Sequence, residues 1–269
     1  MILACAVSCA AQIPEDIHSP VHKAWDILMN AAFSPRVSQR SAGIRALGVL
    51  RDNRLGRELA ENALNDTNPD VRVAAATALG QMHATESVPK LQHALDDHKI
   101  PVVMAAAHAL QLLDDKASAY IVYYELLTGE RKANDGLIAQ QMETLRSPRE
   151  LAKIGFSEGI GYVPFAGMGW DAWRTIHKKD PNPTRAVAAT YLANDPDPHS
   201  AKALVKATSD KNWIVRVAAI EAIAKRGDAS LLPKVAVRFT DKSEKERYNA
   251  AAAVIRLSAI EESATAKGD

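Results

Sequence analysis

One stretch decides the fold: Asp66-Thr67-Asn68-Pro69-Asp70-Val71-Arg72-Val73-Ala74-Ala75-Ala76-Thr77-Ala78-Leu79-Gly80. Its pattern returns along most of the chain. Moved forward by 31 positions, its apolar residues Val71, Ala74, Ala78 and Leu79 fall on Val102, Ala105, Ala109 and Leu110; moved by 144, they fall on Val215, Ala218, Ala222 and Ile223. A fixed period of this size is typical of a solenoid, in which small helical units stack and bury a continuous core.

The composition favours thin contacts between helices over one bulky core. The chain has 269 residues, of which 47% are hydrophobic and only 5% aromatic. Alanine dominates the apolar set, and it is both the best helix former and small enough to allow close approach. The sequence therefore predicts an all-α fold, an α-solenoid of about six helical pairs.

The charge balance gives no reason to expect a polyanionic partner. The chain carries 33 Lys and Arg residues against 32 Asp and Glu residues. These totals do not favour nucleic acid or an anionic membrane, although they leave open a basic stripe on one face of the molecule. We therefore expect a protein or peptide partner and no nucleic acid.

The N-terminal residues 1–11 are apolar and small, and the polar Pro14-Glu15-Asp16 follows closely. We interpret them as a truncated secretory leader, although no Lys or Arg precedes the apolar run. This interpretation predicts a periplasmic or secreted protein. The alternative is a buried first helix and a cytoplasmic protein. A run this short cannot span a bilayer.

The two cysteines suggest a possible lipid anchor, and their position excludes cysteine chemistry in the rest of the chain. Ala6-Val7-Ser8-Cys9 loosely matches a lipoprotein box, in which Cys9 would carry a lipid anchor. This is the only membrane attachment that we expect. Cys5 and Cys9 both lie in the leader-like segment, so the rest of the chain cannot build a disulfide, a cysteine zinc site or thiol catalysis.

The remaining chain divides by its periodicity. Ser19 and Pro20 predict the start of a capping helix, with Ser as N-cap and Pro at the first helical position. Along the chain, the predicted parts are the capping helix at 18–33, repeats 1–3 at 34–129, an atypical fourth unit at 130–180, repeats 5–6 with a C-terminal cap helix at 181–262, and a frayed tail at 263–269.

Two local signals refine the last repeats. Ser243 and Glu246 have the spacing of a capping box, in which each side chain would bond the backbone of the other. The run Asp195-Pro196-Asp197-Pro198 predicts a rigid acidic turn. It supplies too few oxygen ligands at loop spacing for calcium.

The repeat unit resembles a HEAT repeat of the short, bacterial, phycobilisome-lyase-like kind. The resemblance rests on Asp-x-Asn-Pro-Asp-Val-Arg-x-Ala-Ala-Ala-x-Ala-Leu-Gly followed by Val-Pro-x-Leu-x-x-Ala-Leu, and it is strongest at residues 66–97 and 210–240. It implies a structural ladder of Asp and Arg side chains between successive repeats. Candidate ladder residues recur six apart, at Asp66 and Arg72, Asp210 and Arg216, and Asp241 and Arg247. The ladder is expected to break in the third repeat, where Val103 replaces the Arg.

Residues Gly155 to Trp170 interrupt the period with five glycines and several aromatic residues. The spacing of Gly159 and Gly161 does not match a phosphate cradle. Two interpretations stay open: a structural loop that buries its own aromatic rings, or a loop that contacts a partner or a membrane. The candidate partner-binding residues, including a tyrosine cluster in the third repeat, are Tyr120, Tyr123, Tyr124, Tyr162, Phe165, Trp170 and Trp173.

No motif indicates catalysis. Some HEAT-like proteins are di-iron hydroxylases with His-Glu dipeptides as ligands, and none of the eight histidines here precedes a Glu. Nucleophile-elbow and zinc-protease motifs are also absent from the sequence. We therefore expect no cofactor, no metal site and no enzyme.

The expected function is a non-catalytic scaffold that binds a protein or peptide on the inner helical surface of the solenoid, with the 155–170 loop as a second contact. The alternatives are an enzyme or accessory of the HEAT-like lyase or hydroxylase kind, and a membrane-associated lipoprotein scaffold.

Overall fold

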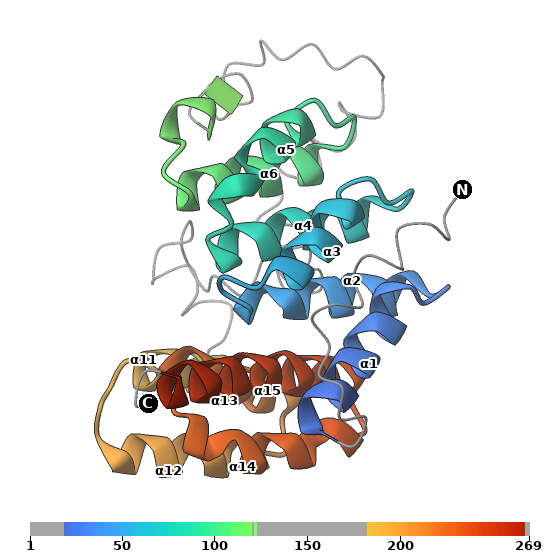
Figure 1. The fold of residues 1–269 in the computed structure, drawn as a ribbon. Helices are drawn as coiled ribbons and strands as arrows, with labels where there is room; N and C mark the ends of the chain where they lie inside the picture. The colour runs from blue at the N-terminus through green and yellow to red at the C-terminus, as the bar shows by residue number, and fades with distance from the viewer. Residues whose placement is uncertain (1–18, 120, 123–181, 267–269) are drawn as a thin grey trace. The chain divides into compact units, whose positions relative to one another are not determined.

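The computed structural model describes residues 19–119, 121–122 and 182–266 (Figure 1). Within these residues, helices are the only regular secondary structure. The described residues fall into two compact units: 36–119 with 121–122 form one, and 19–35 with 182–266 form the other. We call their described helices the N-terminal array (α2 to α6) and the C-terminal array (α11 to α15 together with α1).

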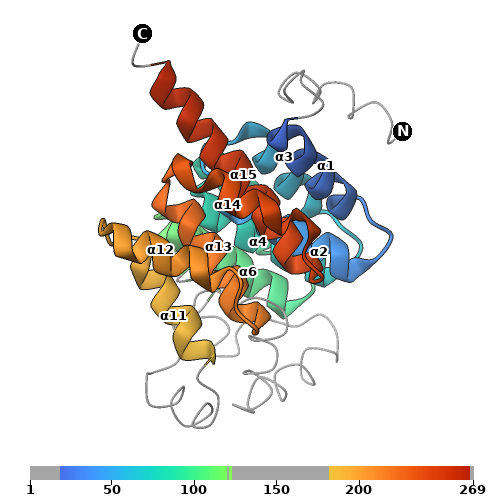
Figure 2. The same cartoon turned by 90° about the horizontal axis from the view of Figure 1, so that it is seen from below.

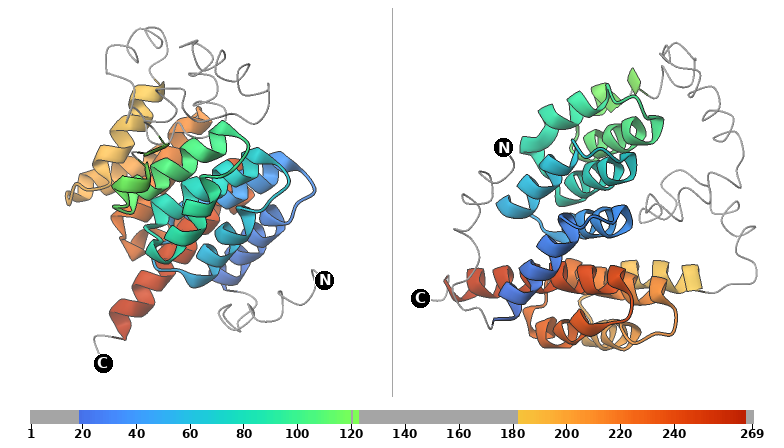
Figure 3. Two further views of the ribbon diagram at one scale, coloured as in Figure 1. Left: turned by 90° about the horizontal axis from the view of Figure 1, so that it is seen from above. Right: turned by 90° about the vertical axis from the view of Figure 1, so that its right-hand side faces the viewer.

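The N-terminal array is a stack of helical pairs. Long helix α4 packs between α2 and α6, while the shorter α3 packs against α4 and α5 against α6. Figure 3 shows these helices stacked in chain order, from blue to green. Their bounds, with two short 3₁₀ turns, are α2 Val37–Ala46, η2 Leu47–Val49, α3 Arg54–Ala63, α4 Pro69–Met82, η3 Thr85–Ser87, α5 Val88–Ala94 and α6 Ile100–Leu112.

Helices α4 and α1 begin at side-chain caps that their sequences predict. At α4, the side chain of Asn68 accepts a hydrogen bond from the amide of Asp70 at 2.8 Å, and Pro69 occupies the first turn. At α1 (Pro20–Ala32), Ser19 Oγ accepts from the amide of His22 at 3.1 Å, which confirms the predicted cap. A cap of this kind satisfies one of the amides that the first helical turn leaves without a partner.

The backbone is left-handed at the same point after several helices, although only one of the residues there is glycine. Asp52, His83, Asp114 and Gly227 all have positive φ, at 56°, 57°, 69° and 74°. These positions are equivalent in the repeat, since they differ by 31 residues or by 144. The left-handed conformation ends the helix and turns the chain toward the next one. The repeat therefore fixes the backbone conformation here even where glycine is missing.

The core confirms the predicted repeat. The three equivalent sets of apolar residues that start at Val71, Val102 and Val215 are all buried, with at most 6% of any side chain exposed. Leu79, Leu110 and Ile223 are fully buried, whereas Leu192 is only half-buried. Each array therefore has its own dry row of small and branched side chains.

Helices α4 and α6 approach each other closely at Gly80. A Cβ atom at this position would lie 2.9 Å from the Cα of Ala109, closer than non-bonded carbon atoms allow. The glycine and the facing alanine thus let two backbones pack in near contact. Alanine-rich helices of this kind make a tight stack without large side chains between them.

The C-terminal array repeats the arrangement. Helix α13 packs between α11 and α15, with α12 against α13 and α14 against α15. Figure 2 shows the end of α15 extending beyond the other helices of this array. The bounds are α11 Asn182–Leu192, α12 Pro198–Ala207, α13 Trp213–Arg226, η5 Ala229–Leu231, α14 Leu232–Ala236, η6 Val237–Thr240 and α15 Glu244–Thr265.

The first helix of the chain belongs to this array. Helix α1 packs against α15, and the two cross in Figure 3. Its buried face consists of Ala24, Trp25, Leu28 and Ala31, and the ammonium of Lys23 lies 5.9 Å from the ring centroid of Phe239. The sequence placed this helix as a cap before the first repeat. The structure shows it covering the last helix of the C-terminal array.

Helix α15 also continues further than expected. Residues 263–265, predicted as part of a frayed tail, are helical, and the hydroxyl of Ser263 donates to the carbonyl of Ala259 at 2.7 Å.

Candidate partner-binding surfaces

A ladder of arginine–aspartate pairs joins successive repeats of the N-terminal array. Arg40 donates from Nε and Nη2 to the carboxylate of Asp66 at 2.9 and 3.1 Å. Arg72 donates in the same way to Asp97 at 2.6 and 3.0 Å. Arg72 also donates to the backbone carbonyl of Asp66 at 2.8 Å. Each arginine thus binds the next repeat through a bidentate pair, and Arg72 also binds its own repeat through a carbonyl.

The second of these pairs is largely removed from water. Only 8% of the Arg72 side chain and 11% of the Asp97 side chain are exposed. Burial alone would raise the pKa of Asp97, but the hydrogen bonds from Arg72 and the amide of Lys99 outweigh it and lower the pKa below its usual value. Asp97 therefore remains a ladder residue, although Val103 provides no arginine for a further step.

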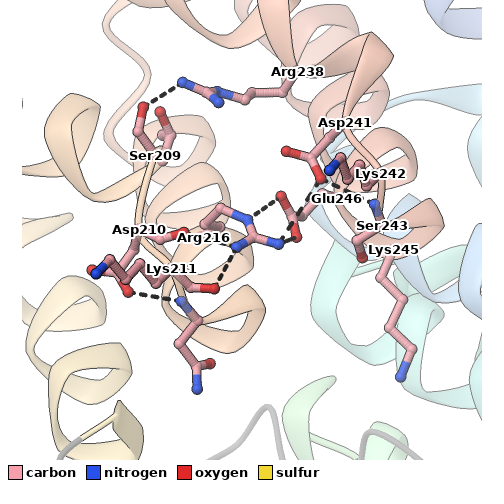
Figure 4. A network of polar contacts seen from close by, with 12 residues as sticks. Ser209, Asp210, Lys211, Arg216, Arg238, Asp241, Lys242, Ser243, Lys245 and Glu246 are labelled. Carbon is pink, nitrogen blue, oxygen red and sulfur yellow. Dashed lines mark hydrogen bonds and ion pairs between the residues drawn. The ribbon is translucent and has the colours of Figure 1, made fainter.

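The C-terminal array contains the same ladder with one difference. Arg185 pairs with Asp210, as expected from the repeat. Arg216 donates from Nε and Nη2 to Glu246, and its Nη2 lies 3.9 Å from the carboxylate of Asp241 (Figure 4). A glutamate inside α15 has thus taken the place that the ladder aspartate has elsewhere.

Glu246 corrects the predicted capping box. Ser243 makes no side-chain hydrogen bond to the helix start, and the Glu246 side chain points to Arg216. Glu246 is 0% exposed, and the equivalent positions hold the buried Val71, Val102 and Val215. Burial and the neighbouring carboxylate of Asp241 raise the pKa of Glu246, while Arg216 opposes them. The capping box does not form because Glu246 is buried. A buried carboxylate gains more stabilisation from the Arg216 guanidinium than from a backbone amide at the exposed start of α15.

Arg247, the last predicted ladder residue, makes no step to a further described repeat. Its Nη1 donates to the backbone carbonyl of Asp241 at 2.8 Å, and its Nη2 lies 3.7 Å from Glu244. It therefore makes the carbonyl contact of the ladder, as Arg72 and Arg216 do.

A different arginine holds the acidic turn before α12. Arg226 donates to the backbone carbonyls of Asp195, Pro196 and Asp197. Asp197 caps α12 by accepting from the amide of His199 at 2.8 Å. The turn is therefore fixed by a cation on its carbonyl side and serves as structure.

Helix α6 exposes apolar side chains at positions where the equivalent residues of α4 are buried or polar. Within Ile100–Leu112, His108 and Gln111 are the only polar residues. Met104 is 36% exposed and Leu112 is 39% exposed, with half-buried His108 between them on the same helical row. The equivalent positions on α4 are the buried Val73 and the polar Thr77 and Gln81. We call Met104, His108 and Leu112 the α6 row.

Burial lowers the pKa of His108. A neutral imidazole between two apolar side chains leaves the α6 row uncharged at neutral pH. Exposed Met and Leu side chains that share one helical row offer a contact surface for apolar groups of another molecule. This row was not among the predicted contact residues. The sequence does indicate it, because Met104 and Leu112 stand at repeat positions where α4 has Val and Gln.

Seven aromatic residues that the sequence indicates as partner-binding candidates lie outside the described residues. They are Tyr120, Tyr123, Tyr124, Tyr162, Phe165, Trp170 and Trp173. The same holds for Cys9, the leader-like segment 1–11 and the Gly155–Trp170 stretch.

The described residues bring together no obvious centre for metal chemistry. In 19–119, 121–122 and 182–266, no group of three or more His, Cys, Asp or Glu side chains is arranged to hold a metal ion. No helix in this part of the chain has the length and hydropathy needed to cross a bilayer.

Comparison with known proteins gives a family and several similar structures. The family described as HEAT repeats matches residues 57–128 and 171–256, more than half of the chain. No curated protein matches the sequence.

Among solved structures, human deoxyhypusine hydroxylase in complex with glycerol is 15% identical, with 89% of this chain and 97% of that chain covered and a TM-score of 0.35. The CpcE–CpcF complex of phycocyanin lyase from Nostoc sp. PCC7120 is 20% identical, with 94% and 97% covered and a TM-score of 0.35. A computationally designed armadillo repeat protein for modular peptide recognition is 14% identical, with 88% and 99% covered and a TM-score of 0.26.

Proposed function

Because this chain belongs to the HEAT-repeat family, we propose that it is a non-catalytic scaffold that binds another protein through the α6 row of its N-terminal array. The observation that carries this proposal is the row itself. Met104 and Leu112 remain more than a third exposed on a helix that packs against α4 and α5, although the Leu112 side chain also lies near Gly80 of α4. Exposed apolar side chains on a fixed helix are a common basis of protein recognition.

The rest of the array supports this use by being rigid. The bidentate Arg40–Asp66 and Arg72–Asp97 pairs join repeats, and Gly80 lets α4 and α6 pack at backbone contact. A surface that keeps its shape loses little conformational entropy when a partner binds. Met104 supplies the adaptable part, since its unbranched side chain can fit partner surfaces of different shape.

The test uses charge placed on the row. Met104→Glu introduces a carboxylate where the partner's apolar surface would lie, and the matched control His93→Glu places the same charge on the exposed side of α5. Proteins captured from the native host by the full-length chain would be identified, purified and titrated against each variant. We expect Met104→Glu to weaken binding roughly tenfold or more, since charge at an apolar contact centre costs over 1 kcal/mol.

Two controls make the result decisive. Circular dichroism of both variants should match that of the parent chain, because both sites are exposed. Equal affinities of Met104→Glu, His93→Glu and the parent for the purified partner would refute the α6 row as the binding surface.

A further inference from the structure

We propose that a second surface, on the C-terminal array, binds an extended acidic segment of the partner protein. This surface consists of Lys211, Trp213, Lys242 and Lys245, and we call it the basic edge. It lies where α13 and α15 begin. Figure 4 shows Lys211 on one side of the Arg216 cluster and Lys242 and Lys245 on the other. The inference rests on the proposed function, since it takes the partner to be a protein.

The ladder acids do not neutralise the basic edge. Asp210 is paired with Arg185, and Glu246 and Asp241 share Arg216. In the part of the chain that the structure describes, no carboxylate oxygen lies within ion-pair distance of Lys211 or Lys242, and both lysines are exposed. The ladder therefore occupies Asp210, Asp241 and Glu246, and Glu244 lies 3.7 Å from Arg247, so Lys211 and Lys242 remain as positive charges of this edge.

The positions of the lysines follow the repeat. Lys211 directly follows the ladder residue Asp210, and Lys242 directly follows Asp241, 31 residues later. Equivalent side chains therefore recur at the same point of successive repeats. The corresponding residues of the N-terminal array are Thr67 and His98, so neither of these two positions holds a lysine there.

Trp213 gives the edge an apolar contact. Its side chain is 36% exposed, and the Lys245 ammonium lies 4.6 Å from the ring centroid. The same position in α4 holds Pro69, so the aromatic ring is not required by the repeat. A lysine over a tryptophan face combines a charge with a large flat surface, which suits a chain of carboxylates interspersed with apolar groups.

The basic edge is defined by side chains, and two backbone amides at the helix starts already have partners within the protein. The side chain of Asn212 accepts from the amide of Ile214 at 2.9 Å, and Asp241 accepts from the amide of Ser243 at 3.0 Å. These amides are therefore already satisfied by the protein. An acidic segment would be recognised by the lysine side chains, so binding should weaken as salt concentration rises.

A peptide, not a nucleic acid, fits this surface. The basic edge offers three lysines and one aromatic ring, while the chain as a whole has a net charge of only +1. Nucleic-acid surfaces gain affinity from many phosphate contacts and from several stacked bases. A short acidic segment needs only a few spaced cations and one apolar anchor.

The experiment measures fluorescence anisotropy of a labelled peptide of alternating Glu and Gly with the full-length chain. A second peptide has Gln in place of every Glu. We expect the Glu peptide to bind and the Gln peptide not to bind. The double variant Lys211→Gln/Lys242→Gln should weaken binding about fivefold to tenfold, as expected for two exposed ion pairs.

The matched control Lys116→Gln/Lys202→Gln removes two exposed lysines elsewhere and should leave binding unchanged. Equal binding of the two peptides, or equal effects of the two double variants, would overturn the proposal. So would tighter binding of a single-stranded oligonucleotide of the same charge, since the edge would then be a nucleic-acid surface. Failure here with an intact effect of Met104→Glu on the purified partner would refute the basic edge and leave the proposed function standing.

Discussion

At the residue scale, the stability of the ladder depends on how far each pair is removed from water. Arg72 and Asp97 are almost completely buried, whereas half of the Arg185 side chain is exposed. Removing one partner of a buried pair leaves an uncompensated charge, while exposed pairs contribute little. The same ladder step should therefore differ greatly in energy between the two positions.

We predict that Arg72→Ala lowers the free energy of unfolding by about 3–5 kcal/mol, and that Arg185→Ala lowers it by at most about 1 kcal/mol. Urea denaturation followed by circular dichroism measures both. Similar losses in the two variants would show that burial does not control the energy of these pairs.

The pH dependence of stability follows from the aspartates. Hydrogen bonds from the arginines and from backbone amides lower the pKa of Asp66 and Asp97 below that of a free aspartate, although burial opposes them. Their contribution is therefore fully present above the usual aspartate pKa and is lost as the pH falls through the lowered values. Denaturation midpoints of the parent chain should drop in acid, and Arg72→Ala should flatten this drop. An equally steep drop in Arg72→Ala would contradict the assignment.

Glu246 should behave in the opposite way. Its pKa is raised, so ionisation costs stability as the pH rises above the usual glutamate value of 4.5. Glu246→Val restores the valine of the other repeats and leaves Arg216 with Asp241 and the carbonyl of Asp210. We predict that the free energy of unfolding of Glu246→Val, relative to that of the parent chain, rises as the pH increases from acid to neutral, because the variant has no buried carboxylate to ionise. Thermal unfolding at several pH values measures this difference; a relative loss on going to neutral pH would show that Arg216 requires the ionised Glu246.

The sequence predicted which residues belong to the ladder better than it predicted which of them pair. Spacing identified Asp66 and Arg72 as ladder residues, but their carboxylate and guanidinium bind different repeats. Arg40, which pairs with Asp66, was missed although it lies 32 positions before Arg72. Residue spacing gives equivalence between repeats, whereas pairing depends on which side chains the stack brings together.

At the element scale, the helix ends include non-glycine residues in the left-handed backbone conformation, which glycine adopts more readily. His83 adopts φ 57° at the position where α13 ends with Gly227. A non-glycine residue costs about 1–2 kcal/mol in this conformation, and glycine loses about 0.5–1 kcal/mol in unfolded-state entropy. We predict that His83→Gly raises the free energy of unfolding by roughly 0.5–1 kcal/mol. Chemical denaturation would detect this gain, and destabilisation would mean that the His83 side chain contributes contacts that outweigh the strain.

Helix α1 is the second test at this scale. Trp25 is 3% exposed, within the face of α1 that packs on α15. We predict that Trp25→Ala destabilises the C-terminal array by about 3–5 kcal/mol, because it leaves a cavity against the last helix. Hydrogen exchange should show lost protection in α15 and unchanged protection in α4. Loss in α4 with an unaffected α15 would place α1 elsewhere.

At the scale of the whole molecule, the period of the sequence predicted the stacking and the buried rows, since both depend on neighbours along the chain. It could not predict that α1 packs against α15, because a repeat pattern contains no information on contacts between the two ends of a chain. It also missed the α6 row and the basic edge, because both are departures of Met104, Leu112, Lys211 and Trp213 from the repeat.

The central claim is that the stack presents the α6 row to a protein partner. Photo-crosslinking in the native host tests it most directly, with a benzophenone amino acid placed at Met104, at Leu112 and, as the control, at His93 on α5. We predict that positions 104 and 112 crosslink to the same protein and that position 93 does not. Equal crosslinking from position 93, or a co-purifying partner that never crosslinks from positions 104 and 112, would contradict the account.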